Sequence, residues 1–293
     1  MANPANTKYS PAAGSPATPS TDTELLQLRA TYLDLLKMSL RNGLYEKPAA
    51  DPTATDWARA GALFAKFKMK YGSKLPKVSV AEVKDHLKFN RREAHTLANP
   101  QQMENVQYCV ETALRDGVEG DLIETGVFRG GQTILMRGIL KAYGVTDRRV
   151  FVADSFEGLP VPKAEVSDII AHDFLSLVHH FKVTSEEVRT NFANYGLLDD
   201  QVCFLKGWFA DTLPTAPIEK LAVMRLDGDY YESTMDALNH LYPKLSPGGF
   251  AIIDDYGQPV GCRQAVTEYR QRHSISEPIQ DVEGLTVFWR RAV

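Results

Sequence analysis

The segment Asp121-Leu-Ile-Glu-Thr-Gly-Val-Phe-Arg-Gly-Gly-Gln-Thr133 decides the fold class of this 293-residue chain. Its first residues form a short apolar run, which is typical of a buried strand. The glycines that follow let the backbone turn tightly into an amphipathic helix, which we expect over residues 131–143. A strand, a glycine turn and a helix in this order predict the first unit of an α/β fold.

The same alternation continues outward from this segment to the end of the chain. Further apolar runs typical of strands lie at 150–154, 202–205, 221–226 and 250–253. Helical patterns are found at 185–195, 231–242 and 262–273. The last two runs, 279–282 and 285–290, predict a hairpin with an antiparallel edge strand. We therefore expect an α/β fold with a doubly wound, mostly parallel seven-stranded sheet.

Before Gly117 the pattern consists of helices and loops. Residues 1–22 are rich in Pro, Ala, Ser and Thr and are predicted to be a disordered tail. The next segment predicts a helix to about Asn42 with one apolar stripe, comprising Leu25, Leu28, Tyr32, Leu35, Leu36 and Leu40. This stripe indicates a packing helix or a dimer surface, and the alternative is a substrate lid. Further helices are expected at 56–70, 80–89 and 101–116. Residues 23–117 thus form a helical region that provides lid, acceptor or oligomer contacts, and residues 118–293 form the α/β domain.

Composition excludes several classes of protein. The 33 Lys and Arg against 37 Asp and Glu give a net charge of −4, which argues against nucleic acid as a partner. Three distant cysteines without a Cys-x-x-Cys pair argue against a disulfide scaffold and fit a reducing cytoplasm. No apolar run reaches the roughly 18 residues of a membrane helix, and the start of the chain lacks the apolar core of a signal peptide. We expect a cytoplasmic protein that does not act on membranes.

The turn after the first strand carries Glu124, Gly126, Gly130 and Gly131. Its spacing is not the Gly-x-Gly-x-x-Gly of dinucleotide folds. It is closer to the acidic-x-Gly-x-x-x-Gly turn of enzymes that bind S-adenosylmethionine (SAM). These four residues are therefore predicted to bind a cofactor, and the alternative is a plain strand-to-helix turn.

Two further strand ends provide candidates for the rest of the cofactor site. Asp154, followed by Ser155, ends the second strand, where an acidic side chain can accept both ribose hydroxyls of a nucleoside or cap the next turn. Gly207, Trp208 and Phe209 follow the third strand and either line an adenine site or, for the two aromatics, belong to the core. All five residues are predicted to contact the cofactor.

The fourth and fifth strands end in acidic residues, namely Asp227, Asp254 and Asp255. Because consecutive parallel strands are usually neighbours, these carboxylates should converge at the carboxyl edge of the sheet. Such close anions repel unless protons or a cation compensate, and oxygen ligands suit Mg²⁺ or another hard divalent ion. Asp229 is a weaker candidate, because with Glu232 it forms a plausible capping box for the next helix.

Five motifs in order resemble the macrocin O-methyltransferase (TylF-like) family. They are DLIETGVFRGG (121–131), DSFEGLP (154–160), FLKGWFADTLP (204–214), LDGDYYEST (226–234) and IIDDYG (252–257). The resemblance implies a class I methyltransferase fold, SAM as the methyl donor and Mg²⁺-dependent O-methylation, mostly of sugar hydroxyls in natural products. It also implies a small-molecule acceptor.

The same resemblance assigns roles to the candidate residues. It implies that Asp227, Asp254 and Asp255 hold the metal, and that Glu124 and Gly126 line the methionine end of SAM. Asp154 would bind the ribose, and the turn at 207–209 would lie on the adenine side. Asp227 is also the expected general base, with Asp229 as the alternative if it is not a helix cap.

Two other functions stay open at this point. Asp227-Gly-Asp229 also matches the Asp-x-Asp motif of metal-dependent glycosyltransferases, although that interpretation ignores the glycine turn. The other alternative is a SAM-binding protein without catalysis, and the presence of all three aspartates argues against it.

Overall fold

The computed structural model describes residues 21–44, 53–72, 94–163, 167–172, 182–258 and 261–293. The helix predicted at 80–89 and residues 1–20 of the predicted tail lie outside this part of the chain. The other N-terminal helices are present as expected, with α1 at Thr21–Leu40, α2 at Ala54–Tyr71 and α4 at Pro100–Arg115.

In the part of the chain that the structure describes, seven strands form one sheet in the order β3-β2-β1-β4-β5-β7-β6. The first five are mutually parallel, while β7 is antiparallel to both β5 and β6. The strands are β1 (Asp121–Thr125), β2 (Val150–Asp154), β3 (Val202–Lys206), β4 (Leu221–Leu226), β5 (Leu245–Ile253), β6 (Gln280–Val282) and β7 (Thr286–Arg290). This confirms the predicted doubly wound, mostly parallel sheet with its antiparallel hairpin at one edge.

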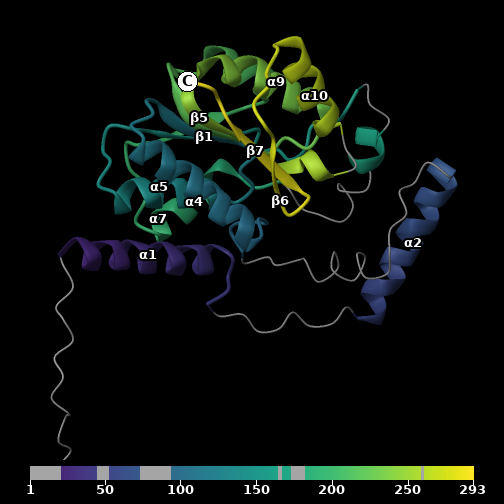
Figure 1. The fold of residues 1–293 in the computed structure, drawn as a ribbon. Coiled ribbons are helices and arrows are strands. Elements are labelled where there is room, and N and C mark those ends of the chain that lie inside the picture. Colours follow the sequence, from purple (N-terminus) through teal and green to yellow (C-terminus); the bar gives the residue numbers. More distant parts are fainter. Residues whose placement is uncertain (1–20, 45–52, 73–93, 164–166, 173–181, 259–260) are drawn as a thin grey trace, which may run out of the picture.

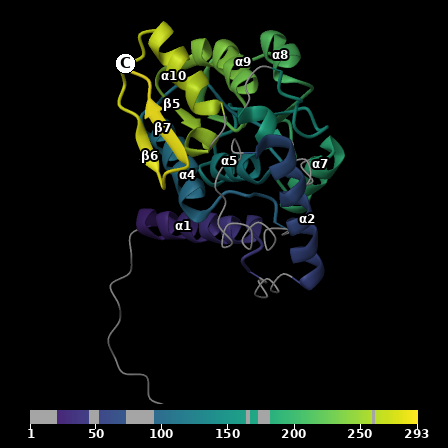
Figure 2. The same cartoon turned by 90° about the vertical axis from the view of Figure 1, so that its right-hand side faces the viewer.

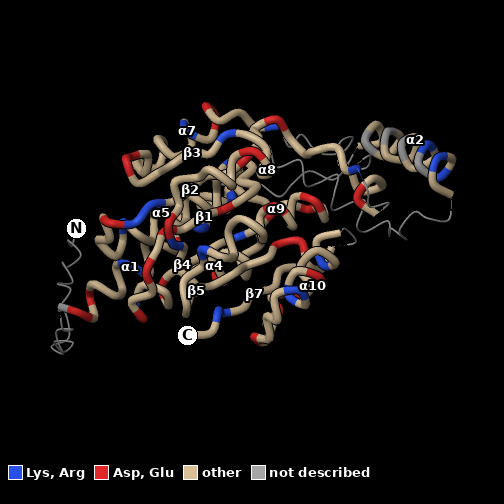
Figure 3. The backbone as a smooth tube through the Cα atoms, turned by 90° about the horizontal axis from the view of Figure 1, so that it is seen from above, with Lys and Arg blue, Asp and Glu red and all other residues tan. Residues whose placement is uncertain are grey.

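Helices cover both faces of the sheet (Figures 1 and 2). On one face lie α4, α5 (Gly131–Ala142) and α7 (Ser185–Asn194), with α1 packed outside α5. On the other face lie α8 (Phe209–Thr212), α9 (Tyr231–Leu241) and α10 (Cys262–Arg272). Alternate residues of each strand enter the two cores, as Leu122 and Ile123 of β1 illustrate. In Figures 1 and 3, α2 extends away from this layered body.

Helix α1 packs only part of its predicted apolar stripe against the body of the protein. Leu36 and Leu40 of that stripe are buried, together with Leu33 and Lys37, whereas Leu25, Leu28, Tyr32 and Leu35 are exposed. The first half of α1 is held instead by Arg29, whose Nε donates to the carbonyl of Ala142 at 2.9 Å. Two rows of apolar side chains therefore share the helical period, and packing against α5 buries only one of them.

The order of the strands places the candidate site. Strand β1 lies between β2 and β4, so the chain winds outward in both directions from the β1–β4 pair. In such sheets ligands bind outside the carboxyl ends of the strands at this reversal point. Gly126 and Asp227, which follow β1 and β4, lie next to each other there, because the amide of Asp227 donates to the carbonyl of Thr125 at 2.9 Å.

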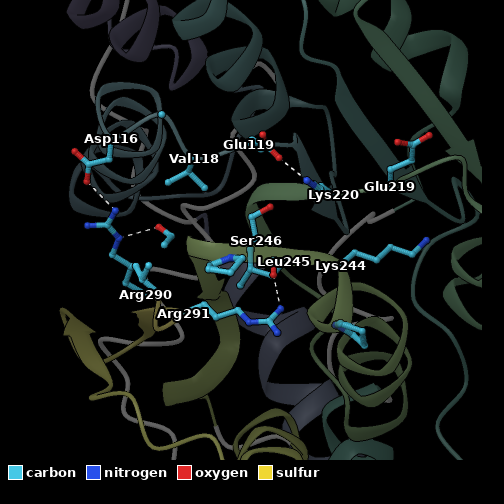
Figure 4. Close-up of a pocket in the computed structure, with 15 residues that line it drawn as sticks. Asp116, Val118, Glu119, Glu219, Lys220, Lys244, Leu245, Ser246, Arg290 and Arg291 are labelled. Atoms are coloured by element: carbon cyan, nitrogen blue, oxygen red, sulfur yellow. Dashed lines mark hydrogen bonds and ion pairs between the residues drawn. The ribbon is translucent and has the colours of Figure 1, made fainter.

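The opposite, amino edge of the sheet holds a cavity of about 580 Å³ (Figure 4). Two ion pairs lie in its lining: Lys220 contacts Glu119, and Arg290 lies 2.7 Å from Asp116. None of the residues predicted to bind cofactor or metal lines this cavity. Acidic and basic residues are interspersed along the described chain (Figure 3), and no helix of the described part is long and apolar enough to cross a membrane.

Candidate active site

The three aspartates predicted to bind a metal do converge. Strands β4 and β5 pair in register, with Leu226 beside Ile253, so Asp227 and Asp254 leave the sheet side by side. Asp255 follows in the short 3-10 turn Asp254–Gly257. One carboxylate oxygen from each of the three aspartates lies within 4.8 Å of the others. This spacing is close enough for a single cation to contact all three.

A buried arginine that the sequence analysis missed lies inside this cluster. The Nη1 of Arg225 is 2.5 Å from Oε1 of Glu124 and 2.8 Å from Oδ2 of Asp227. Its Nη2 is 2.7 Å from Oδ1 of Asp254. Glu124, predicted to line the cofactor, is therefore joined to two of the predicted metal ligands through one guanidinium.

Neutral donors engage the cluster from its outer side. Gln102 Nε2 and Thr286 Oγ1 donate to Oδ1 of Asp254 at 2.9 and 2.7 Å. The amide of Asp229 donates to Oδ2 of Asp255 at 2.9 Å. Each predicted metal ligand thus has one oxygen held by the protein, and the other makes no hydrogen bond with the described residues. Orientation of this kind by an outer shell is usual for metal ligands.

Burial and mutual repulsion dominate the electrostatics of the cluster. The pKa of Asp227 is raised well above its ordinary value by burial and by Asp254, with Arg225 acting in the opposite direction. The pKa of Asp255 is also raised, by burial and by Asp229 and Asp254. Burial raises the pKa of Glu124 to about 7 despite Arg225. One guanidinium does not balance this many carboxylates, so a further cation or protons must compensate.

The capping box suggested for Asp229 is not formed. Asp229 has a left-handed backbone with φ of +55°, and the N-cap of α9 is Tyr230, whose side chain makes no capping bond. The start of α9 is capped from a distance instead, since Asp168 accepts a bond from the amide of Tyr231 at 2.8 Å. Asp229 therefore faces the acidic cluster, and burial and Asp227 raise its pKa to about 8.

The glycines of the first turn permit close backbone approaches. A Cβ at Gly126 would lie 1.8 Å from the carbonyl oxygen of Asp227, so no other residue fits between β1 and β4. A Cβ at Gly131 would lie 2.6 Å from the carbonyl oxygen of His95. Gly130 is the N-cap of α5, with φ of +86°. The amides of all three glycines donate to backbone carbonyls within the protein.

Asp154 and Ser155 both take part in the turn after β2. The carboxylate of Asp154 accepts from the amides of Val127 and Phe156 at 2.8 and 2.7 Å, which ties the ends of β1 and β2 together. Burial raises its pKa, and the bond from Phe156 opposes this. Ser155 Oγ donates to the carbonyl of Gly158 at 2.9 Å. These bonds leave the ribose role of Asp154 a prediction, since a carboxylate can accept further bonds.

The two aromatics after β3 differ in exposure. The side chain of Phe209 packs against the core beneath α8 and α9, whereas Trp208 is 39% exposed. The amide of Gly207 donates to the carbonyl of Asp154 at 2.9 Å, which places this turn beside the end of β2. Trp208 is thus the aromatic side chain of the pair that remains available to a ligand.

Gln132 is a second residue that sequence reasoning missed. It lies in the first turn of α5, directly after the glycine turn, and is only 2% exposed. Neither its Oε1 nor its Nε2 has a hydrogen-bond partner. A buried amide without partners is costly, so such a group points to a ligand or ordered water.

Comparison with known proteins decides the family. A profile of the family described as macrocin-O-methyltransferase (TylF) matches residues 29–291. The chain belongs to this family. It is therefore an O-methyltransferase, and its sheet is that of the class I methyltransferase fold.

Three similar proteins fit this family membership. The chain is 48% identical over 278 residues to "Mycinamicin III 3''-O-methyltransferase" of Micromonospora griseorubida, covering 94% of this chain and 99% of the relative. It is 57% identical over 199 residues to "8-demethyl-8-(2,3-dimethoxy-alpha-L-rhamnosyl)-tetracenomycin-C 4'-O-methyltransferase" of Streptomyces olivaceus, covering 67% and 76% of the two chains. The solved structure of the O-methyltransferase NovP matches with a TM-score of 0.73 and 42% identity, covering 90% of this chain and all of that one.

For this O-methyltransferase, one of the two missed residues had a signal in the sequence. Arg225 lies two positions before Asp227 on a strand, so both side chains point to the same face of the sheet. A charged residue within the apolar run 221–226 is unusual and requires a buried partner. Gln132 had no such signal, because a glutamine in the first turn of a helix is ordinary.

Proposed function

We propose that this O-methyltransferase transfers the methyl group of SAM to a hydroxyl of a sugar in a natural product, with Mg²⁺ or another hard divalent cation bound at the acidic cluster. The observation that carries the proposal is the set of carboxylate oxygens of Asp227, Asp254 and Asp255, which lie within 4.8 Å of one another beside the glycine turn. A methyl acceptor and a metal would meet there at the reversal point of the sheet.

The residues at the end of β1 and the start of α5 fit SAM. The zwitterionic methionine end of SAM needs both a hydrogen-bond donor and an acceptor, and the orphaned amide of Gln132 offers both. The start of α5 also favours the carboxylate of that end, because the amino end of a helix attracts anions. Asp154 ends β2 and Trp208 follows β3, and these are the next two strands outward from β1 along the edge. This order suits a ribose at Asp154 and an adenine at Trp208.

The donor set of the cluster fits a hard divalent cation. Its free ligand atoms are carboxylate oxygens, which Mg²⁺ and Ca²⁺ prefer over softer donors. Arg225 already provides one positive charge, which the sequence argument had not foreseen. Glu124, Asp227, Asp229, Asp254 and Asp255 still outnumber it, so either protons or a cation must compensate the remaining carboxylates, and a divalent cation would take the place of the protons.

The chain's own residues supply orientation and proton transfer. A sugar hydroxyl is a weak nucleophile near neutral pH, and a bound divalent cation would lower its pKa. Asp227 is the proposed general base, because one of its oxygens is held by Arg225 while the other is free to face the acceptor. Asp229 is the alternative base, since it is not used as a helix cap. The fold must hold the attacking oxygen in contact with the methyl group before reaction.

The sugar acceptor is proposed from the relatives. The two named above act on mycinamicin III and on a rhamnosyl tetracenomycin, as their descriptions state. A third relative, 51% identical over 203 residues, is "Demethyldecarbamoylnovobiocin O-methyltransferase" of Streptomyces niveus. We infer an acceptor of the same class, a small glycosylated natural product, bound by a cytoplasmic enzyme whose cysteines are unpaired.

We also infer that the exposed apolar residues of α1 form the contact with a second copy of the chain. Leu25, Leu28 and Leu35 are 45%, 67% and 51% exposed on one side of this helix. Contiguous apolar patches of this kind mark interfaces. Light scattering should give a dimer or larger assembly for the native protein and a smaller species for Leu28→Ser.

One assay separates this function from its alternatives. Labelled SAM is incubated with the enzyme and a panel of glycosides and phenols, first with Mg²⁺, then after EDTA treatment, then with Mg²⁺ restored. We expect label in a glycoside, a loss of at least about 10²-fold in EDTA, and recovery with Mg²⁺. Full activity in EDTA would remove the metal from the mechanism. Label in a phenol and in no glycoside would remove the sugar from the proposal.

A further inference from the structure

Arg225 is the one cation within the acidic cluster of the described residues, and its position is unusual. It is 2% exposed and contacts three carboxylates that come from different strands. Glu124 lies in β1, Asp227 follows β4 and Asp254 follows β5. A buried arginine is costly unless its charge is paired and the N–H groups of its guanidinium have hydrogen-bond acceptors. Here the fork joins the predicted cofactor turn to the predicted metal ligands.

The contacts of Arg225 divide the oxygens of two ligands. Its Nη1 holds Oδ2 of Asp227 and its Nη2 holds Oδ1 of Asp254. Because the guanidinium is planar and rigid, these two bonds set the direction of both carboxylates at once. One oxygen of each also lies within 4.8 Å of an oxygen of Asp255, so the fork holds two of the three carboxylates at the spacing that a single cation needs. Without the fork, Asp254 would keep its bonds from Gln102 and Thr286. Asp227 would lose its bond from Arg225, and repulsion from Asp254 would turn its carboxylate away.

A cation bound at the cluster would feel two opposite effects of this arginine. The positive charge of Arg225 repels another cation and weakens its binding. The fixed orientation of the carboxylates strengthens binding, because the ligands need not be brought together against their repulsion. Outer-shell partners of metal ligands are worth about 10–100-fold in metal affinity. The many carboxylates near Arg225 reduce the net effect of its charge. We therefore expect the fixed orientation of the ligands to outweigh the repulsion between Arg225 and the cation.

We propose that Arg225 is a positioning residue, whose guanidinium presets Asp227 and Asp254 for a divalent cation before that cation binds. This inference rests on the proposed metal dependence. It predicts that metal affinity, more than the rate at saturating metal, depends on the shape of the Arg225 side chain.

Two substitutions separate shape from charge. Arg225→Lys keeps the positive charge but has no planar fork, so it tests orientation alone. The double variant Glu124→Gln with Arg225→Met removes the fork together with one of the three carboxylates that it contacts, so less repulsion is left behind than in Arg225→Met alone. Asp254 keeps its bonds from Gln102 and Thr286 in this variant, which favours folding.

Arg137→Lys is the matched control. Arg137 is 5% exposed, and its Nε and Nη2 both contact the carboxylate of Asp199, at 3.0 and 2.5 Å. It is thus another buried arginine with a two-point carboxylate contact, on α5 and outside the acidic cluster. Its substitution has the same kind of structural cost without any effect on the metal ligands.

The experiment measures Mg²⁺ binding to the metal-free enzyme by calorimetry, together with S-adenosylhomocysteine binding and the Tm in EDTA. We expect Mg²⁺ affinity to fall about 10–100-fold in Arg225→Lys and in the double variant. Arg137→Lys should keep the native Mg²⁺ affinity even where its Tm falls. In methyl transfer, the Mg²⁺ concentration for half-maximal rate should rise in Arg225→Lys, while kcat at saturating Mg²⁺ recovers most of its native value.

Native or tighter Mg²⁺ affinity in both Arg225 variants would overturn the proposal, because Arg225 would then act only through its charge or as a structural ion pair. If Arg225→Lys does not fold, the double variant decides by the same criterion. A native enzyme that binds S-adenosylhomocysteine but no Mg²⁺ would refute the metal dependence itself, and the positioning role with it. That result is distinguishable, since the loss then appears in the native protein and not only in the variants.

Discussion

The two edges of the central sheet carry charged residues in opposite arrangements. At the amino edge, Lys220 and Glu119 form a pair whose side chains are 60% and 72% exposed. At the carboxyl edge, the Arg225 side chain is 3% exposed and is surrounded by more carboxylates than it can neutralise. Both edges are polar. The charges of the Lys220–Glu119 pair balance each other and are exposed to water, whereas the carboxylates around Arg225 outnumber it and are buried.

This difference indicates where a ligand is needed. An exposed pair is screened by water and contributes little to stability or binding. A buried cluster with excess negative charge pays a large desolvation cost unless protons or a cation compensate. The amino edge holds a cavity of about 580 Å³ (Figure 4), but the charge balance points to the carboxyl edge as the place where a ligand binds.

The largest effect should come from removing one acidic ligand. Asp254→Asn and Asp255→Asn keep the shape of each side chain but remove a charged metal ligand, so each should lower turnover by about 10²-fold or more. Asp116→Asn, at the amino edge, is the matched control and should keep native turnover. Initial rates of methyl transfer with saturating SAM measure this, and equal losses in all three variants would contradict the contrast between the edges.

A smaller loss is expected when the second strand end is changed. Asp154→Ala should weaken S-adenosylhomocysteine binding about tenfold, since bonds from a ribose to a carboxylate contribute about 1.5–3 kcal/mol. Because Asp154 also accepts hydrogen bonds from the amides of Val127 and Phe156, the Tm of the variant should fall as well. Calorimetry on the folded variant is the measurement. Unchanged affinity would mean that the ribose is held elsewhere.

A more selective loss should follow from Gln132→Leu. The substitution removes the amide donor and acceptor that we expect the ligand to use, and leaves no unpaired polar atom on this side chain. It should therefore weaken S-adenosylhomocysteine binding by about 2–10-fold. Binding of 5′-methylthioadenosine, which lacks the methionine end, should stay native. The control is Gln201→Leu at the start of β3, where Nε2 donates to two backbone carbonyls. Equal losses for both ligands would remove Gln132 from the methionine end.

The smallest effect is expected at the amino edge. Lys220→Ala removes one member of an exposed pair, so Tm, cofactor affinity and turnover should all remain native. Thermal melting and the transfer assay in the same buffer test this. A clear loss of activity would mean that the amino-edge cavity takes part in function and would weaken the contrast between the two edges.

Much of the fold was predictable from local patterns. The apolar runs at Asp121–Thr125 and Leu221–Leu226 were strands with those bounds, because a short run between turn signals has few other structures open to it. The helix α4 began where its capping box begins, with Asn99 and Gln102 exchanging bonds. Of the stripe predicted for α1, Leu36 and Leu40 are buried and the other four residues are exposed, because a second apolar row that includes Leu33 satisfies the same period.

The sequence by itself determined the order of strands and helices, the position of each acidic residue at a strand end, and the motifs of the macrocin O-methyltransferase family. These follow from residues close in the chain, where periodicity and turn chemistry act. Only the tertiary structure decided which charges meet. Arg225 and Glu124 are 101 positions apart, and Gln102 reaches Asp254 across 152 positions. The order of the strands and the cost of burying an unpaired charge determine which of these side chains meet. Neither can be derived from residues that are close in the sequence.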